Sequence, residues 1–189
     1  LERPPLSKTF LSADGEDDRR FALRKPDWFA DNDIQLLDGC RVTAVLTDAR
    51  QVETTSGERM SYDRLVLATG ATPRRFAATD GMDGVFELRH QDDAARLRSA
   101  STDASSAIVI GGGYIGLEVA ATLAKSGKYV TVIEAAPRLL ARVASPAISA
   151  FFADLHANAG TTVITDARVE DITAEHGSFI HVTLSDGRQ

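Results

Sequence analysis

The segment from Ile108 to Gly116 constrains the fold more than any other part of this sequence. It reads Ile-Val-Ile-Gly-Gly-Gly-Tyr-Ile-Gly, so an apolar stretch leads directly into glycines at 111, 113 and 116. We predict a buried strand over 107–110, a helix over 113–125 and a second strand over 129–134. Alternation of strands and helices favours a parallel sheet covered by helices, with right-handed crossovers. The predicted fold class is therefore α/β.

The spacing Gly-x-Gly-x-x-Gly gives each glycine a physical task. Gly111 permits a tight turn, Gly113 lets a diphosphate approach the backbone, and Gly116 lets the helix pack against the strand. The helix N-terminus presents unpaired N–H groups and the positive end of its dipole to the anion. We predict a Rossmann-like dinucleotide-binding turn, with Tyr114 and Ile115 also at the cofactor. The alternative is a strand-to-helix turn that binds nothing.

Glu134 ends the second predicted strand, 18 residues after Gly116. A carboxylate at this place accepts hydrogen bonds from the ribose hydroxyls of NADH and repels the 2′-phosphate of NADPH. The residues that follow it, Ala135-Ala136-Pro137, include no arginine, and Arg138 comes four residues later. We predict that NADH is the preferred cofactor. The alternative for Glu134 is an ordinary solvated strand end.

The rest of the sequence separates into two regions at the serine-rich stretch 99–106. We expect a partial first domain over 1–102 and a C-terminally incomplete dinucleotide-binding domain over 103–189. The second domain adds a helix over 145–159, a strand over 161–165 and an antiparallel hairpin over 169–173 and 179–184. The first domain has a short helix from Pro26, strand-like runs at 34–37, 42–46, 51–55 and 64–68, and a helix over 91–101. The run 65–70 is apolar and predicts a strand buried on both faces.

Composition excludes several classes of protein. The 189 residues carry a formal net charge of −6 and are 43% hydrophobic and 25% charged, as in a soluble globular protein. An acidic chain is a poor partner for nucleic acid, and no apolar run is long enough to span a membrane. Cys40 is the single cysteine, and the four histidines show no ligand spacing, so we predict no metal site. A cytoplasmic location is expected.

Both ends of the chain suggest a piece of a longer protein. The sequence begins at Leu1 inside a proline-containing polar segment. It ends on 185–189, Ser-Asp-Gly-Arg-Gln, which is typical of a hairpin turn without its return strand.

Several motifs together resemble one family. They are Glu-Arg-Pro-Pro-Leu-Ser-Lys at 2–8, Tyr-Asp-Arg-Leu-Val-Leu-Ala-Thr-Gly at 62–70, Leu-Arg at 88–89, the glycine motif through Val119, and Ala-Pro-Arg-Leu-Leu at 136–140. The chain resembles the FAD-dependent, NADH-using ferredoxin reductases, including putidaredoxin and rubredoxin reductases, of the pyridine nucleotide–disulfide oxidoreductase superfamily. The resemblance implies that NADH reduces FAD and that FAD reduces a ferredoxin-like iron–sulfur protein. This chain lacks the family's first glycine motif, its later Gly-Asp segment and its third domain.

The resemblance also implies roles for individual residues. Lys8 would place its ammonium beside the reactive flavin nitrogen, Glu118 would be its partner, and Tyr114 would stack over the flavin and move aside for the nicotinamide. An unpaired buried lysine would lose its proton, so a carboxylate partner keeps it charged. The alternatives are two solvated surface charges and a phenol that merely packs. Further implied FAD contacts are Arg3, Pro4, Val42, Ala68, Thr69, Gly70 and Arg89, although Val42 and Ala68 are equally explained as buried strand residues.

The class of electron acceptor is inferred from the absence of a redox-active cysteine pair at residues 3–8. Larger relatives carry a cysteine pair beside the flavin, where this sequence has Arg-Pro-Pro-Leu-Ser-Lys at 3–8. Electrons would therefore leave the flavin for an external acceptor, and the family implies an iron–sulfur protein. Two alternatives stay open: a non-catalytic NAD(H)-binding fragment without a complete FAD site, and a related flavoenzyme that reduces quinone or oxygen.

Overall fold

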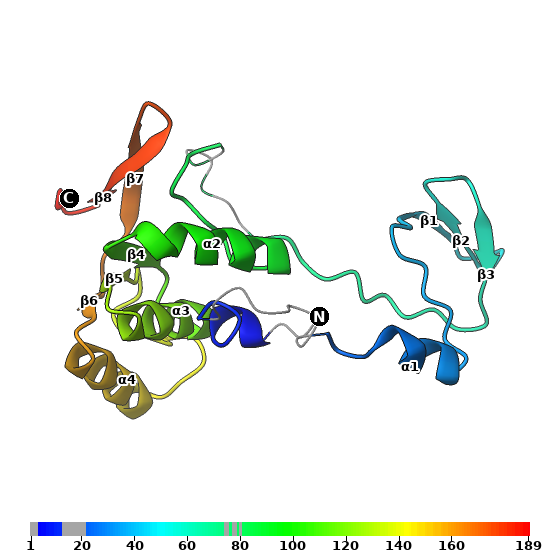
Figure 1. The fold of residues 1–189 in the computed structure, drawn as a ribbon, viewed down its shortest axis with the longest axis horizontal. Coiled ribbons are helices and arrows are strands. Elements are labelled where there is room, and N and C mark those ends of the chain that lie inside the picture. Colours follow the sequence, from blue (N-terminus) through cyan, green and yellow to red (C-terminus); the bar gives the residue numbers. More distant parts are fainter. Residues whose placement is uncertain (1–3, 13–21, 74–75, 77–78, 80) are drawn as a thin grey trace. The chain divides into compact units, whose positions relative to one another are not determined.

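The computed structural model describes residues 4–12, 22–73, 76, 79 and 81–189 (Figure 1). The chain divides into two compact units, one formed by residues 1–22 and 73–189 and the other by residues 23–72. Within the described residues, no helix is both long enough and apolar enough to cross a bilayer.

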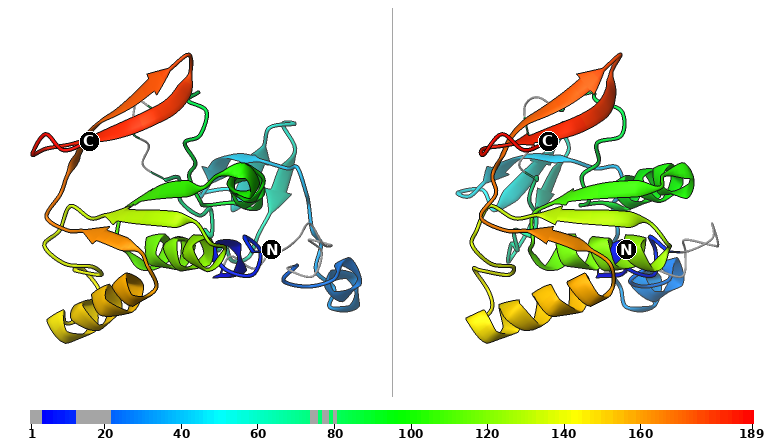
Figure 2. Two further views of the ribbon diagram at one scale, coloured as in Figure 1. Left: turned by 60° about the vertical axis from the view of Figure 1, so that its left-hand side comes forward. Right: turned by 90° about the vertical axis from the view of Figure 1, so that its left-hand side faces the viewer.

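The larger unit is built on the predicted parallel sheet. Its strands are β4 (Ser106–Ile110), β5 (Tyr129–Ile133) and β6 (Thr162–Ile164), in the order β4-β5-β6. Both strand pairs are parallel, with Ile108 opposite Thr131 and Thr131 opposite Thr162. Helices α3 (Tyr114–Lys125) and α4 (Pro146–Asn158) lie on one side of the sheet, and the antiparallel hairpin of β7 (Val169–Glu175) and β8 (Ser178–Leu184) lies on the other (Figure 2). These elements confirm the predicted α/β fold.

The alternation of side chains along β5 explains this arrangement of layers. Val130 and Val132 are buried in one apolar cluster with Leu117, Ala120 and Leu123 of α3. Ile133 is buried in a second cluster with side chains of the β7–β8 hairpin: Val169, Ile172, Val182 and Leu184. A strand with apolar residues on both faces is stable only when both faces are covered, as they are here.

Two shorter elements complete the larger unit. Helix α2 (Gln91–Asp103) begins with a capping box in which the His90 side chain and Asp93 exchange hydrogen bonds with backbone N–H groups. The 3₁₀-helix η1 (Pro4–Ser7) lies beside α3 (Figure 1) and contacts both α3 and α2. Leu6 and Phe10, on η1 and just after it, are buried together with Ala94 of α2. The N-terminal segment is thereby fixed to two helices that lie far later in the sequence.

The smaller unit is an antiparallel meander preceded by a short helix. It contains α1 (Pro26–Asp31), β1 (Val42–Leu46), β2 (Gln51–Thr54) and β3 (Arg59–Ser61), in the sheet order β1-β2-β3. The predicted helix and the strands over 42–46 and 51–55 are confirmed. The strand β3 was not predicted, because its three residues are too few to form an apolar run.

Two predicted strands are wrong. Neither residues 34–37 nor residues 64–70 form a helix or a strand. Val66 and Leu67 are 84% and 71% exposed, so this run is not buried. A strand covered on both faces needs neighbouring strands, and none of the described strands pairs with this run. The run has the apolar composition of a buried strand, but it forms no strand here because no neighbouring strand pairs with it.

Candidate functional site

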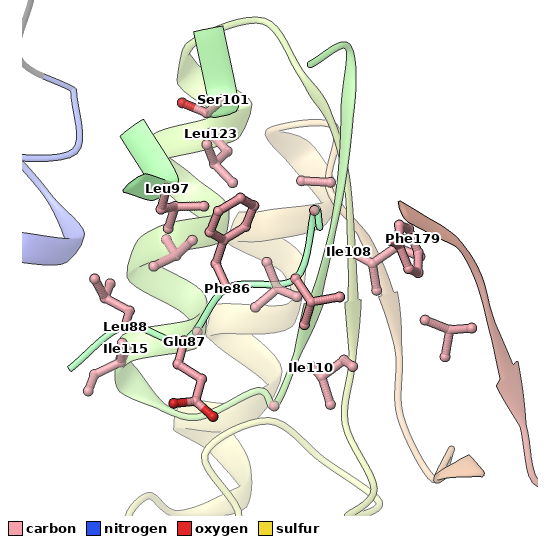
Figure 3. A pocket seen from close by; sticks show the side chains of 18 of the residues that line it. Phe86, Glu87, Leu88, Leu97, Ser101, Ile108, Ile110, Ile115, Leu123 and Phe179 are labelled. Carbon is pink, nitrogen blue, oxygen red and sulfur yellow. The ribbon is translucent and has the colours of Figure 1, made fainter. Parts of the chain in front are cut away.

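A cavity of about 880 Å³ opens beside the glycine turn of the larger unit (Figure 3). Its walls are largely apolar, with side chains from Phe86, Leu97, Ile108 and Phe179 pointing toward it. Ligand sites in proteins have this size range and this combination of apolar walls with few polar groups. Six residues predicted at the cofactor line the cavity: Gly111, Gly113, Tyr114, Ile115, Gly116 and Glu134.

The turn that leads into α3 has the geometry that its glycines permit. Gly111 has φ = +110°, a backbone conformation that side-chain-bearing residues rarely adopt. A Cβ added to Gly116 would overlap the carbonyl oxygen of Gly111 and lie 3.3 Å from Cγ1 of Val109. Any side chain at 116 would therefore push α3 away from β4. These are the two tasks that the spacing predicted for the first and third glycines.

Gly113 gives a direct test of whether a diphosphate fits. A Cβ built on Gly113 meets nothing within 4 Å, so the space beside its backbone is open toward the cavity. Gly113 is the N-cap residue of α3, its position carries no side-chain cap, and the first turn holds no acidic residue. The N–H groups at this helix start are thus left for an anion. The residues present fit the diphosphate of a dinucleotide.

Glu134 is held more firmly than the sequence suggested. Its Oε2 accepts a hydrogen bond from the Gly112 N–H at 2.6 Å, and its Oε1 accepts one from the Ala136 N–H at 2.8 Å. A carboxylate has about four acceptor positions, so two remain for ribose hydroxyls. The backbone bonds fix the orientation of the carboxylate at the edge of the cavity.

Sequence reasoning missed Gly112, which carries no assigned task in Gly-x-Gly-x-x-Gly. A Cβ at this position would lie 2.5 Å from Cδ2 of Leu139 and 3.1 Å from Cβ of Glu134. Leu139 is only 1% exposed and cannot easily move aside. The signal in the sequence was the middle one of the three consecutive glycines, which the motif itself does not require.

Two arginines follow Glu134, and the structure separates their roles. The Arg138 guanidinium donates to the carbonyl oxygens of Ala144 and Ala141 and to the Ser149 hydroxyl, at 2.7 to 2.9 Å, and so ties the loop after β5 to α4. Arg142 is exposed and lines the cavity. Sequence reasoning gave Arg142 no part, because seven residues separate it from Glu134.

Lys8 and Glu118 form an ion pair. The Lys8 Nζ lies 2.8 Å from Oε2 of Glu118, with side chains 48% and 32% exposed. The Ser7 hydroxyl donates to the same carboxylate oxygen at 2.6 Å. Partial burial alone would raise the pKa of the Glu118 carboxyl, but the hydrogen bonds from Lys8 and Ser7 and the charge of Lys8 lower that pKa below its ordinary value. The carboxylate is therefore ionised at neutral pH and can pair with the Lys8 ammonium.

Tyr114 lines the cavity and lies on the same face of α3 as Glu118. It is the first residue of α3 and lies four residues before Glu118, so the two share a face of the helix. Tyr114 is 56% exposed and lines the cavity, whereas neither Lys8 nor Glu118 does. The ammonium, the carboxylate and the phenol are thus brought to one face of α3.

Two further residues predicted at FAD lie in the larger unit. The carbonyl oxygen of Pro4 accepts a hydrogen bond from the Lys8 ammonium at 3.3 Å. The Arg89 N–H donates to Oδ2 of Asp93 at 3.0 Å, which fixes the backbone of Arg89 just before α2. Burial alone would raise the pKa of Asp93, but backbone N–H groups and Arg96 lower it.

The other predicted FAD contacts are not in the described part of the larger unit. Val42, Ala68, Thr69 and Gly70 belong to the smaller unit and are exposed, so the alternative that Val42 and Ala68 are buried strand residues does not hold. Arg3 lies outside the described residues. Among those that are described, no three His, Cys, Asp or Glu side chains are placed to hold a metal ion.

Comparison with known proteins identifies the family. The sequence profile of the pyridine nucleotide-disulphide oxidoreductases matches residues 1–189. The chain belongs to this family. Within the family it is similar to putidaredoxin reductase CamA of Pseudomonas putida, with 43% identity over 170 residues that make up 88% of this chain and 40% of the relative.

Two solved structures of the family share the fold. The ferredoxin reductase for the CYP199A2 system of Rhodopseudomonas palustris has a TM-score of 0.92 and 38% identity, and the putidaredoxin reductase of a covalent complex with putidaredoxin has 0.91 and 39%. Each alignment covers 98% of this chain and 46% of the other. The chain thus spans less than half the length of the family members that it matches.

Proposed function

We propose that this chain is part of a flavoprotein reductase that passes electrons from NADH through FAD to a ferredoxin-type iron–sulfur protein. The observation that carries the proposal is the Lys8–Glu118 ion pair on the same side of α3 as Tyr114 and the dinucleotide-binding turn. In this proposal the pair would hold a cation one helix turn from Tyr114, which lines the cavity that we assign to NADH. The similarity to putidaredoxin reductase supports the same reading.

In this proposal the larger unit binds and orients NADH. The diphosphate would lie against the Gly113 backbone at the start of α3, where the helix dipole favours negative charge. The Glu134 carboxylate, fixed by the Gly112 N–H, would accept the ribose hydroxyls and disfavour a 2′-phosphate. NADH would therefore be preferred over NADPH.

Three side chains would act where the hydride moves. FAD, when bound, supplies the ring that accepts a hydride and gives up electrons singly. The Lys8 ammonium would stabilise the negative charge that develops there, and Glu118 would keep that ammonium in place and charged. Tyr114, which is exposed and lines the cavity, would cover the site until nicotinamide enters. Arg3 and Arg89 would neutralise the FAD diphosphate; Pro4, Val42, Ala68, Thr69 and Gly70 would contact FAD.

The acceptor is proposed from the residues that replace a redox disulfide. The segment that leads into Lys8 carries no cysteine, and the one cysteine of the sequence, Cys40, is exposed in the smaller unit. A putidaredoxin reductase has been solved in covalent complex with putidaredoxin. We propose that the acceptor of this protein is also a ferredoxin-type iron–sulfur protein.

We also propose that residues 1–102 belong to an FAD-binding domain and residues 103–189 to an NADH-binding domain. The proposed location is the cytoplasm, where NADH is available.

The test uses the full-length protein that contains this chain. Purified protein should be yellow, should lose its flavin absorbance on addition of NADH, and should reduce a ferredoxin faster than a quinone or oxygen. Colourless protein that still binds NADH would support a non-catalytic nucleotide-binding role instead. Faster turnover with quinone or oxygen than with ferredoxin would assign it to a different class of flavoenzyme.

A further inference from the structure

The Lys8–Glu118 ion pair is too exposed to hold its own geometry. With side chains 48% and 32% exposed, both groups are reached by water. Such pairs contribute little on their own, because they are screened and because long side chains lose rotamer freedom when they are fixed. If the ammonium has to occupy one position, other contacts must hold its partner and its backbone.

Ser7 supplies a second hydrogen bond to the carboxylate. Its hydroxyl lies 2.6 Å from Oε2 of Glu118, the oxygen that also contacts Lys8. The hydroxyl must donate, because the carboxylate is an acceptor only. Ser7 is 5% exposed and has a short side chain, so the donor of this bond is shielded from water and few rotatable bonds are ordered.

The backbone of Ser7 is held by the next turn of the same helix. The Thr122 hydroxyl donates to the carbonyl oxygen of Ser7 at 2.8 Å. Thr122 lies four residues after Glu118, so the two side chains share one face of α3. Two successive turns of α3 therefore form hydrogen bonds with Ser7. Glu118 accepts from the Ser7 side chain, and Thr122 donates to the Ser7 main chain.

The opposite side of the segment is held by α2. The Arg98 guanidinium lies over the Phe10 ring, 4.6 Å from its centroid, and donates to the Phe10 carbonyl oxygen at 3.2 Å. Phe10 is fully buried and packs with Ala94. The residues on each side of Lys8 are thus fixed without any contribution from the ion pair.

We infer that Ser7 is a positioning residue for hydride transfer: its hydroxyl orients the Glu118 carboxylate, and its Thr122-bound backbone sets where the Lys8 side chain begins. The inference rests on the proposed function and adds to it a residue that acts through Glu118 and Lys8. It explains why a small polar side chain is buried directly before the cation.

The test compares Ser7→Ala with Ser7→Thr in the full-length, flavin-loaded protein. Ser7→Ala should lower the limiting rate of flavin reduction by NADH about tenfold, as expected for one lost hydrogen bond to a charged group, and leave the NADH dissociation constant nearly unchanged. Ser7→Thr keeps the hydroxyl and should restore the rate. Ser12→Ala, in the same segment and exposed, is the matched control and should behave as wild type.

A second readout does not depend on turnover. The carboxyl ¹³C resonance of Glu118, assigned with Glu118→Gln, should titrate at a higher pH in Ser7→Ala than in wild type, because a donor to the ionised form is lost. Lys8 is the charged group that contacts Glu118 among the described residues, and Arg98 of α2 is engaged with Phe10. The titration can be followed without adding NADH, and it does not require Ser7→Thr to fold.

The two proposals fail in different ways. If Lys8→Met slows flavin reduction while Ser7→Ala changes neither the rate nor the titration, the role of Ser7 is overturned and the proposed function stands. If Lys8→Met leaves reduction unchanged, both are overturned. A slowed Ser7→Ala variant with a shifted titration and rescue by Ser7→Thr supports the positioning role.

Discussion

The ammonium of Lys8 lies 2.8 Å from the Glu118 carboxylate, although Lys8 follows a short N-terminal 3₁₀-helix and Glu118 lies in the middle of α3. Both side chains are partly exposed, so the pair adds little to folding free energy. Glu118 lies one helix turn after Tyr114, which lines the cavity, so we expect the pair to act in the chemistry rather than in folding.

Lys8→Met should slow flavin reduction without weakening NADH binding. The substitution removes a cation that would stabilise developing negative charge, and losing one such group typically costs about 10²- to 10³-fold in rate. The limiting rate and the NADH dissociation constant can be separated by stopped-flow absorbance. Lys125→Met, at the exposed end of α3, is the matched control and should match wild type. Equal rates for the two variants would remove Lys8 from the mechanism.

Gly112→Ala and Gly113→Ala should have opposite consequences. At Gly112 the new methyl would press on Leu139 and Glu134, so we expect a loss of about 1–3 kcal/mol in the free energy of unfolding. At Gly113 the methyl meets nothing, so stability should hold, but the diphosphate would be kept from the backbone and NADH binding should weaken roughly tenfold to a hundredfold. Thermal melts and NADH titrations distinguish the two. A stable Gly112→Ala variant would contradict the packing argument.

The sequence predicted the parallel sheet well because its information is local. Apolar runs at 107–110 and 129–134 and the glycines between them specify strand, turn and helix without reference to distant residues. The prediction of a buried strand over 65–70 is wrong because burial of a strand depends on neighbouring strands, and a local sequence pattern does not show whether they are present. Gly112 and Arg142 were missed for a similar reason, since their roles depend on the path of the loop after β5. The pairing of Lys8 with Glu118 was expected only through the family resemblance.

Glu134→Gln should reduce both the stability of the turn and the preference for NADH. The carboxylate accepts backbone N–H groups from Gly112 and Ala136, and an amide nitrogen in place of one oxygen cannot accept. A buried N–H left without its acceptor costs about 1–3 kcal/mol, partly offset where water reaches it. Loss of the negative charge also removes the repulsion of a 2′-phosphate. The ratio of kcat/KM for NADH to that for NADPH should fall, and an unchanged ratio would show that Glu134 does not select the cofactor.

The stability of the larger unit should depend on pH through Glu118. Its pKa is lowered in the folded protein from an ordinary value of 4.5, so the ionised carboxylate favours folding above about that pH. This contribution is lost as the pH falls through the folded-state value and the carboxyl becomes protonated in both states. Glu118→Gln lacks the contribution at every pH. The melting temperature of wild type should therefore exceed that of Glu118→Gln slightly at pH 6, with the difference shrinking as the pH falls below 4.5. Glu170→Gln, at an exposed site on β7, serves as the control, and a wild-type advantage that grew on acidification would contradict the assignment.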